Sequence, residues 1–262
     1  MIAFRDIAVS YPSRATPVLD GVSIDVPRGQ ITSVVGPNGS GKSTLVRALL
    51  QGVAITKGSI LIDGAPLNTL SRRHVATRVA VMAQREEVTF PLRVTDYVNL
   101  GLFPRIGMWG NASASDRKTQ QYAIEVAEIG DLLDRTISEI SGGEWQRVRI
   151  ARALAQGGDA VVLDEPTTFL DIGHEMAIFE LLEVLRQANK AILLISHHLN
   201  LVARFASSMH LLSRGRLVAS GPPSVVMEPG LLRRVYEWPM RIDDVGGAPA
   251  LTPMRRSESI ER

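Results

Sequence analysis

The amino-acid sequence predicts an α/β fold with a parallel sheet, and two observations support this prediction. A β-branched run at 30–35 leads into a glycine-rich loop and then into a stretch, 43–51, with the apolar spacing of a helix. Further along, the short apolar runs 160–163 and 191–195 flank an amphipathic helix expected over 175–188. Strands that alternate with helices in this way are typical of parallel sheets covered by helices.

Strand-like runs dominate the beginning of the chain, and helices are expected in its middle. The strand-like runs lie at 2–9, 21–26, 31–35 and 59–62. Over 94–154 we expect helices with interruptions at Phe103-Pro104, in the loop 105–115 and at Gly130, because proline and glycine end helices. The chain contains no internal repeat.

The composition fits one large α/β domain, or two small ones, with a substantial core. The chain has 262 residues, of which 45% are hydrophobic and 21% are charged. Its 29 Lys and Arg residues are set against 27 Asp and Glu residues, and no long basic block indicates nucleic-acid binding. Because cysteine is absent, disulfides and thiolate metal sites are excluded.

The apolar runs of the sequence are too short for a transmembrane helix, which needs roughly 20 residues. No apolar signal-peptide core follows Met1, so we expect the protein to stay in the compartment where it is made. Residues 234–242 are expected to include a final strand. Residues 245–262 are rich in Gly, Pro, Ser and Arg, and we expect a flexible tail there, after a single domain over 1–244.

The glycine-rich loop at 36–43 has the spacing G-x-x-x-x-G-K-S of a phosphate-binding loop. In this pattern backbone N–H groups surround a polyphosphate, Lys42 neutralises its outer phosphates and the Ser43 hydroxyl holds Mg²⁺. The following helix would point its positive end at the same phosphates. The expected nucleotide contacts are therefore Gly36, Asn38, Gly39, Ser40, Gly41, Lys42, Ser43 and Thr44.

Two carboxylates follow the apolar run 160–163, at the end of an expected buried strand. Phosphoryl transfer needs support for Mg²⁺, which we assign to Asp164 through water, and a base that orients the attacking water, which we assign to Glu165. The alternative is that these two acids merely end the strand. The apolar residues before them favour the catalytic interpretation.

A second phosphate-binding motif lies about a hundred residues after the first. Ser141, Gly142, Gly143 and Glu144 open a helix expected over 144–156. The free backbone N–H groups and positive end of such a helix can bind a phosphate. Taken alone, the same residues also suit an ordinary flexible turn at a helix start.

These motifs, in this order, make the chain similar along nearly its whole length to the ATP-binding cassette (ABC) ATPases. The resemblance implies a P-loop NTPase with a RecA-like core, a mostly parallel sheet, an N-terminal antiparallel β subdomain and an inserted α-helical subdomain at about 90–155. It also implies ATP and Mg²⁺ as cofactors and a homodimer in the ATP-bound state. Each ATP would then lie between the Lys42 loop of one chain and Ser141 to Glu144 of the other.

Four further positions match the family pattern. By resemblance, Gln84 contacts Mg²⁺ and the attacking water, and His197 contacts the γ-phosphate. Asp171 belongs to the loop that crosses the dimer seam, and Tyr11 stacks on adenine. Seen in isolation, Gln84 suits a surface position and Tyr11 suits simple packing.

Three positions depart from the family pattern. Ile140 replaces the usual Leu before the second phosphate motif, and Glu144 stands where Gln is common. His198 stands where Asp usually follows the histidine, which leaves open which of the two imidazoles reaches the phosphate. We assign this role to His197 because of its spacing from the preceding strand.

Segments 90–101 and 166–175 look like those of ATPase subunits that serve importers of ferric siderophores, haem and vitamin B12. This resemblance implies separate membrane permease subunits, an extracytoplasmic substrate-binding protein that acts indirectly, and a peripheral location on the cytoplasmic face of the cell membrane. The expected docking groove lies around 86–93, with Phe90 as an apolar anchor. No nucleic-acid partner is expected.

Two alternatives remain at this point. A soluble ABC ATPase of DNA repair or translation would carry long heptad coiled coils or two cassettes in one chain, and this sequence has neither. An ABC system for another cargo, such as a metal ion, or for lipid or drug export, would share every motif above, because the cassette does not touch the cargo.

Overall fold

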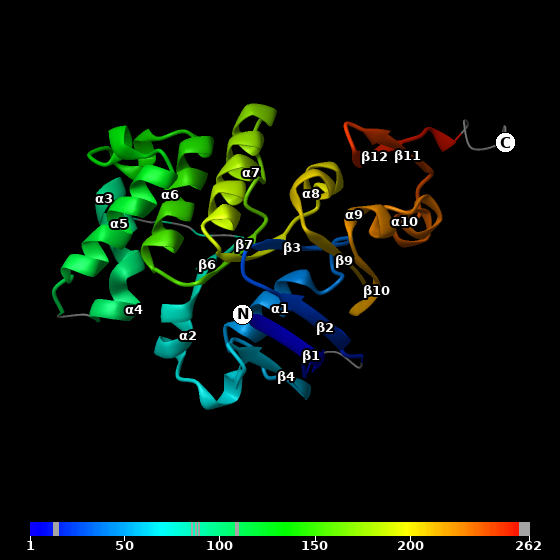
Figure 1. The fold of residues 1–262 in the computed structure, drawn as a ribbon, viewed down its shortest axis with the longest axis horizontal. Coiled ribbons are helices and arrows are strands. Elements are labelled where there is room, and N and C mark those ends of the chain that lie inside the picture. The colour runs from blue at the N-terminus through cyan, green and yellow to red at the C-terminus, as the bar shows by residue number, and fades with distance from the viewer. Residues whose placement is uncertain (13–15, 85, 87, 89, 108–109, 257–262) are drawn as a thin grey trace.

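The computed structural model describes residues 1–262 except 13–15, 85, 87, 89, 108–109 and 257–262. It confirms the α/β fold with a mostly parallel central sheet and an N-terminal antiparallel sheet. Figure 1 shows the helices α3 to α6 gathered on one side of the molecule and the C-terminal elements on the opposite side. The central sheet lies between these two groups.

The central sheet has six strands in the order β10-β9-β3-β8-β7-β6. Only β9 and β10 pair antiparallel; the other four pairings are parallel. Every residue of β7 and β8 is buried, which explains their continuous apolar sequence. The strand bounds are β3 (Gln30–Val35), β6 (Val79–Met82), β7 (Ala160–Asp164), β8 (Ala191–Ile195), β9 (Ser208–Ser213) and β10 (Arg216–Gly221).

The N-terminal sheet is antiparallel, in the order β2-β1-β4-β5. Its strands alternate buried and exposed residues over much of their length, because one face packs on a core and the other faces water. The strands expected at 2–9, 21–26 and 59–62 are all present. The bounds are β1 (Ile2–Val9), β2 (Leu19–Val26), β4 (Lys57–Ile62) and β5 (Ala65–Pro66).

The helical subdomain follows β6 and differs in one respect from the sequence-based expectation. We expected Phe103-Pro104 to interrupt a helix, but a helix begins there, because proline is tolerated in a first turn where its missing N–H has no partner. The helices are α3 (Val94–Asn99), α4 (Phe103–Ile106), α5 (Ala114–Val126) and α6 (Gly142–Ala155), with 3₁₀ turns at Leu100–Leu102, Gly130–Leu132 and Ile137–Glu139.

The remaining helices connect the strands or pack against them. α1 (Lys42–Leu49) follows β3 directly, and α2 (Arg72–Arg78) precedes β6, after a 3₁₀ turn at Leu67–Thr69. The later helices are α7 (Ile172–Gln187), α8 (Leu199–Phe205), α9 (Pro223–Val226) and α10 (Pro229–Tyr236).

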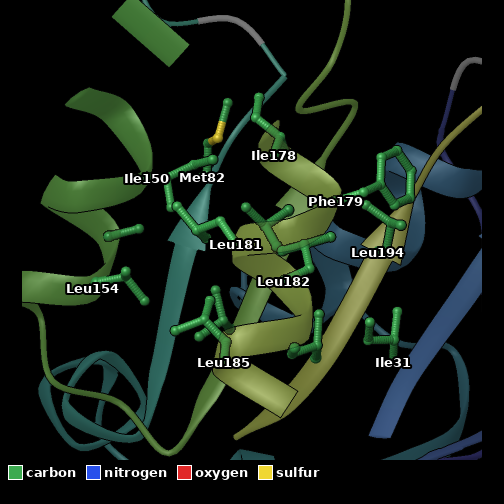
Figure 2. Packing of buried hydrophobic residues seen from close by; sticks show 14 of the residues in the cluster. Ile31, Met82, Ile150, Leu154, Ile178, Phe179, Leu181, Leu182, Leu185 and Leu194 are labelled. Carbon is green, nitrogen blue, oxygen red and sulfur yellow. The ribbon is translucent and has the colours of Figure 1, made fainter. Parts of the chain in front are cut away.

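A continuous apolar core joins the helical subdomain to the central sheet. Figure 2 shows Leu181, Leu182 and Leu185 of α7 between the side chains of α6 and those of the sheet. Ile150 of α6 and Met82 of β6 belong to the same buried cluster. Because each such side chain contributes roughly 1.5–3 kcal/mol on burial, this packing fixes the direction in which α6 points.

The C-terminal segment differs from the expected tail. A hairpin forms from β11 (Met240–Val245) and β12 (Ala248–Pro253), whose turn uses Gly246 and Gly247 with positive φ angles. The side-chain amide of Asn200 holds the backbone of Leu251 through two hydrogen bonds, of 3.1 and 2.7 Å. The strand expected within 234–242 begins late, because α10 occupies residues up to Tyr236.

Candidate functional site

A cavity of about 450 Å³ opens where β3 ends and α1 begins. It is formed by side chains and backbone from the start of the chain, the phosphate loop, the end of β6 and the end of β7. The lining residues are Tyr11, Val18, Asn38, Gly39, Gly41, Lys42, Ser43, Thr44, Arg47, Gln84 and Glu165. Most of the predicted phosphate loop therefore meets Gln84 and Glu165 around one hollow.

The phosphate loop requires glycine at Gly36 for a steric reason. Its φ is +147°, and a Cβ atom at this position would lie 2.0 Å from the carbonyl oxygen of Leu212 in β9. The loop is thus pressed against the neighbouring strand, which aims its backbone into the cavity. Ser40, by contrast, is buried beneath the loop and does not belong to the cavity lining.

Lys42 is the first residue of α1 and is only 7% exposed. Its ammonium donates hydrogen bonds to the carbonyl oxygens of Gly36, at 2.7 Å, and Pro37, at 3.1 Å. Burial lowers the pKa of this ammonium, and the carboxylates of Glu165 and Asp164 partly offset that effect. The Lys42 ammonium therefore lies against the backbone of the phosphate loop, where the carboxylates of Glu165 and Asp164 act on it.

Asp164 ends β7 as a buried carboxylate without a complete set of partners. Its Oδ1 atom has no hydrogen-bond partner among the residues that the structure describes. Burial raises its pKa to about 6, the adjacent Glu165 adds to this effect, and a hydrogen bond with the Ser43 hydroxyl opposes it. An unpartnered carboxylate oxygen beside a hydroxyl oxygen suits a hard divalent cation such as Mg²⁺.

Glu165 is held firmly by its backbone. Its φ is +54°, and its N–H donates to the carbonyl oxygen of Ile195 in the neighbouring strand at 2.9 Å. Its carboxylate oxygen Oε2 lies 2.5 Å from Nδ1 of His197, which follows β8. Because β7 and β8 pair in parallel, with Asp164 opposite Ile195, the two side chains meet at the same sheet edge.

The two neighbouring histidines have different partners. His197 contacts Glu165, whereas Nε2 of His198 lies 3.2 Å from Oε1 of Glu175 in α7. Their rings lie side by side, with centroids 4.1 Å apart. Of the two imidazoles, it is His197 that lies against a residue of the cavity.

Gln84 and Tyr11 both reach the cavity, although only Tyr11 also belongs to a core. Gln84 follows β6 and is exposed on the cavity side. Tyr11 is half-buried and packs against the N-terminal apolar cluster, and within the described part of the chain its hydroxyl has no hydrogen-bond partner. Both interpretations of Tyr11, packing and ligand contact, therefore keep a structural basis.

The second phosphate motif forms the start of α6 and is not part of the cavity lining. The Ser141 hydroxyl accepts a hydrogen bond from the N–H of Glu144, and Oε2 of Glu144 accepts one from the N–H of Ser141 at 2.7 Å. These bonds lower the pKa of the Glu144 carboxyl. The backbone N–H groups of Gly142 and Gly143 have no partner within the helix, as in any first turn.

Asp171 also lies outside that cavity lining and begins α7. Its Oδ1 accepts a hydrogen bond from the N–H of His174 at 2.9 Å and lies 2.8 Å from Nδ1 of the same residue. These contacts lower the pKa of Asp171. Two neighbouring apolar side chains, Phe169 and Ile172, are 102% and 79% exposed.

Some residues of the site were not expected from the sequence. Arg47, in the last turn of α1, lines the cavity and adds a positive charge there. Glu86 lies within ion-pair distance of Arg149 and Arg152, which ties the segment after Gln84 to α6. Only the residue spacing along α1 could have indicated Arg47; the Glu86 pairs join residues more than 60 positions apart and leave no local signal.

Among the helices that the structure describes, none is long and apolar enough to cross a membrane.

A family model described as ABC transporter matches residues 19–168, which is more than half of the chain. The hemin import ATP-binding protein HmuV of Streptomyces coelicolor is 38% identical, over 86% of this chain and 80% of that protein. The iron(3+)-hydroxamate import ATP-binding protein FhuC of Bacillus subtilis is 33% identical, over 90% and 87%. The ferric enterobactin transport ATP-binding protein FepC of Escherichia coli K12 is also 33% identical, over 92% and 90%.

Solved structures agree with this result. A metal-chelate type ABC transporter in an inward-facing conformation matches with a TM-score of 0.83 over 98% of both chains, at 22% identity, and so supports the fold alone. A bacterial ABC transporter cassette solved as a dimer matches with a TM-score of 0.72 over 85% of this chain and 99% of that one, at 26% identity. The chain therefore belongs to the ABC transporter family, as an ATP-binding subunit with ATPase activity.

Proposed function

We propose that this ATPase powers the import of an iron chelate or haem through separate membrane permease subunits. The proposal is supported by the relatives named for hemin, iron(3+)-hydroxamate and ferric enterobactin, each of which aligns over at least 80% of its own length. A cobalamin-like cargo was also expected from the sequence, but none of these three names includes it.

The single observation that carries the mechanism is the separation of the two phosphate motifs. The cavity is lined by the Lys42 loop and Glu165, whereas Gly142 and Gly143, whose N–H groups begin α6, lie outside the cavity lining. We infer that a second copy of the chain supplies its α6 end to complete each ATP site. The exposed apolar side chains of Phe169 and Ile172, on either side of Asp171, suit burial at such a seam.

Hydrolysis then proceeds with the residues of the cavity in separate roles. The carboxylate of Glu165 orients a water molecule and accepts its proton as the oxygen attacks the γ-phosphorus. The bond between that phosphorus and the bridging oxygen breaks, which gives ADP and inorganic phosphate. His197 holds the carboxylate, and Lys42 offsets the charge of the phosphates.

Bound Mg²⁺ would be held by Ser43, by Asp164 through water and by Gln84, and would neutralise phosphate charge. The unpartnered Oδ1 of Asp164 supports this assignment. Tyr11, which also lines the cavity, would stack on adenine.

The permease would dock on the helical subdomain. Phe90, Leu100 and Phe103 are 70%, 53% and 53% exposed, and they offer apolar anchors for a partner segment. Part of the groove expected over 86–93, at residues 87 and 89, lies outside the described residues. Through the permease, an extracytoplasmic binding protein would act indirectly, and this subunit would lie on the cytoplasmic face of the membrane.

The proposed function is tested by purifying the Glu165→Gln variant with ATP from its native membrane and identifying the proteins that come with it. We expect a polytopic permease whose reconstituted vesicles take up an iron chelate or haem when ATP is supplied. Recovery of ribosomal or DNA-bound partners alone would replace the transporter with a soluble ABC ATPase. A permease that takes up or exports a different cargo would overturn the cargo assignment only.

A further inference from the structure

The first turn of α7 touches both of the regions that the proposed function places at different ATP molecules. This turn begins after Asp171, which caps the helix, and it contains the consecutive residues His174 and Glu175. Because successive residues of a helix point about 100° apart, these two side chains reach different neighbours. One reaches the start of α6, and the other reaches the histidine pair beside Glu165.

His174 is wedged between Asp171 and the start of α6. Nδ1 of its ring lies 2.8 Å from Oδ1 of Asp171, which fixes the ring orientation. The opposite edge of the ring faces Gly143, where a Cβ atom would lie 2.1 Å from Cδ2 and 2.6 Å from Nε2 of His174. The start of α6 therefore cannot move toward α7 without displacing this ring.

Glu175 holds the other contact of the turn. Its Oε1 lies 3.2 Å from Nε2 of His198, and its side chain is only 12% exposed. His198 in turn lies with its ring against that of His197, at a centroid distance of 4.1 Å. The orientation of His197 beside the Glu165 carboxylate thus depends on where Glu175 holds His198.

We propose that His174 and Glu175 are positioning residues that link the two ATP sites of the dimer. When the start of α6 binds the ATP held by the partner, Gly143 presses on His174 and thereby fixes the position of the first turn of α7. Glu175 then holds His198, and His198 holds His197 against Glu165. Packed side chains and a rigid helix turn transmit such a movement because they do not deform continuously.

This inference rests on the proposed function, since it requires an ATP-bound dimer, and it makes a specific statement about direction. The link runs within one chain, from its α6 end to its own Glu165. A direct contact of His174 with the partner's ATP would give the opposite pattern, because that ATP is hydrolysed by the partner's Glu165. The two possibilities are separated by placing substitutions on one chain of a dimer at a time.

The test uses heterodimers of two differently tagged chains, one active and one carrying Glu165→Gln, purified over both tags in ATP. Only the site with the active chain's Glu165 hydrolyses ATP. His174→Ala or Glu175→Gln on the active chain is expected to lower the rate about tenfold, and the same substitution on the inactive chain less than twofold. Glu180→Gln, at an exposed position of the same helix, is the matched control.

Further measurements separate positioning from a loss of stability. ATP affinity measured in EDTA, and the thermal unfolding temperature, should stay close to those of the control. In the homodimer, the Hill coefficient for ATP is expected to fall from near 2 toward 1 with Glu175→Gln. His174→Phe, which keeps a ring against Gly143 but loses the Asp171 contact, should give an intermediate rate.

The inference is overturned if the hydrolysis rate falls only when the substitution is on the inactive chain. It is also overturned if the rate falls equally with the substitution on either chain, or does not fall in either case. Failure of the proposed function has a different signature. In that case, the unsubstituted pair of active and Glu165→Gln chains would not form an ATP-dependent dimer, or the isolated active chain would hydrolyse ATP as fast as the pair.

Discussion

His197 and Glu165 meet through the register of two parallel strands. Nδ1 of His197 lies 2.5 Å from Oε2 of Glu165, and the side chains are 50% and 7% exposed. The buried carboxylate is thus anchored by an imidazole that is itself half exposed. A base that is held in one orientation can align a water molecule without further rearrangement, which lowers the cost of reaching the transition state.

The first prediction concerns this pair. Glu165→Gln should lower ATP hydrolysis by about 10²–10⁴-fold, because the amide cannot accept the proton of the attacking water. ATP binding should persist, since Lys42 and the phosphate loop are untouched. Steady-state phosphate release and equilibrium binding of a fluorescent ATP analogue check both statements. Near-normal phosphate release by this variant would remove Glu165 from its role, and Glu180→Gln provides the control.

The second prediction concerns Asp164 in the absence of Mg²⁺. Its pKa in the folded protein is raised to about 6 from an ordinary 3.8, so the folded protein binds more protons than the unfolded chain in this interval. Stability should therefore fall as the pH rises from about 4 to 6, because the buried carboxylate becomes charged. Asp164→Asn should be more stable than the unsubstituted protein at pH 7.5 in EDTA, by about 1–3 kcal/mol.

Urea unfolding at pH 7.5 and pH 4 measures this difference, which should shrink at the lower pH. The same variant should lose Mg²⁺-dependent hydrolysis. A variant that is equally stable or less stable at pH 7.5 would mean that the Asp164 carboxylate is satisfied within the protein, and it would weaken the assignment of this residue to the metal.

The third prediction concerns His210 in β9. Burial lowers its pKa, and its Nδ1 lies 3.0 Å from the Ser220 hydroxyl on β10. The folded protein binds fewer protons here than the unfolded chain, so stability should fall as the pH drops below about 6.5. His210→Gln should reduce this loss between pH 7 and 5. The exposed His74→Gln is the matched control, and an identical pH profile for all three proteins would contradict the prediction.

The fourth prediction concerns the surface proposed for the permease. Phe90→Asp should weaken binding to the permease by at least tenfold, because a charge replaces a 70% exposed apolar anchor. Val225→Asp places the same charge on α9, on the other side of the molecule in Figure 1, and should leave binding in place. Co-purification from detergent with each variant compares them. Equal recovery of the permease with both variants would move the docking surface elsewhere.

The local parts of the site could be predicted from the sequence. The phosphate loop is a contiguous pattern between a strand and a helix, and both elements appear at the expected positions. The roles of Asp164 and Glu165 were predictable because the two acids come directly after the apolar residues of β7. The antiparallel strands near the N-terminus follow in the same way from alternation.

The remaining features depend on contacts between distant residues. Nothing local pairs Glu175 with His198, because the rest of α7 and the whole of β8 lie between them. The composition of 245–262 suggests a coil and gives no sign of the C-terminal hairpin, whose second strand is held at the Leu251 backbone by the side-chain amide of Asn200. The start of α4 at Phe103 is not evident from the sequence, because Phe103-Pro104 fits both an interruption of a helix and a first helical turn.

The central claim is that two chains enclose ATP between the Lys42 loop of one and the Ser141 motif of the other. The most direct measurement is the molar mass of Glu165→Gln by light scattering, with and without ATP and Mg²⁺, together with a chromatographic assay of the nucleotide bound to the same protein. In the presence of ATP and Mg²⁺, we predict a dimer that holds two ATP molecules, and in their absence a monomer. The double variant that also carries Ser141→Arg should be a monomer in both conditions. If Glu165→Gln binds one ATP and remains a monomer in the presence of ATP and Mg²⁺, the claim is contradicted.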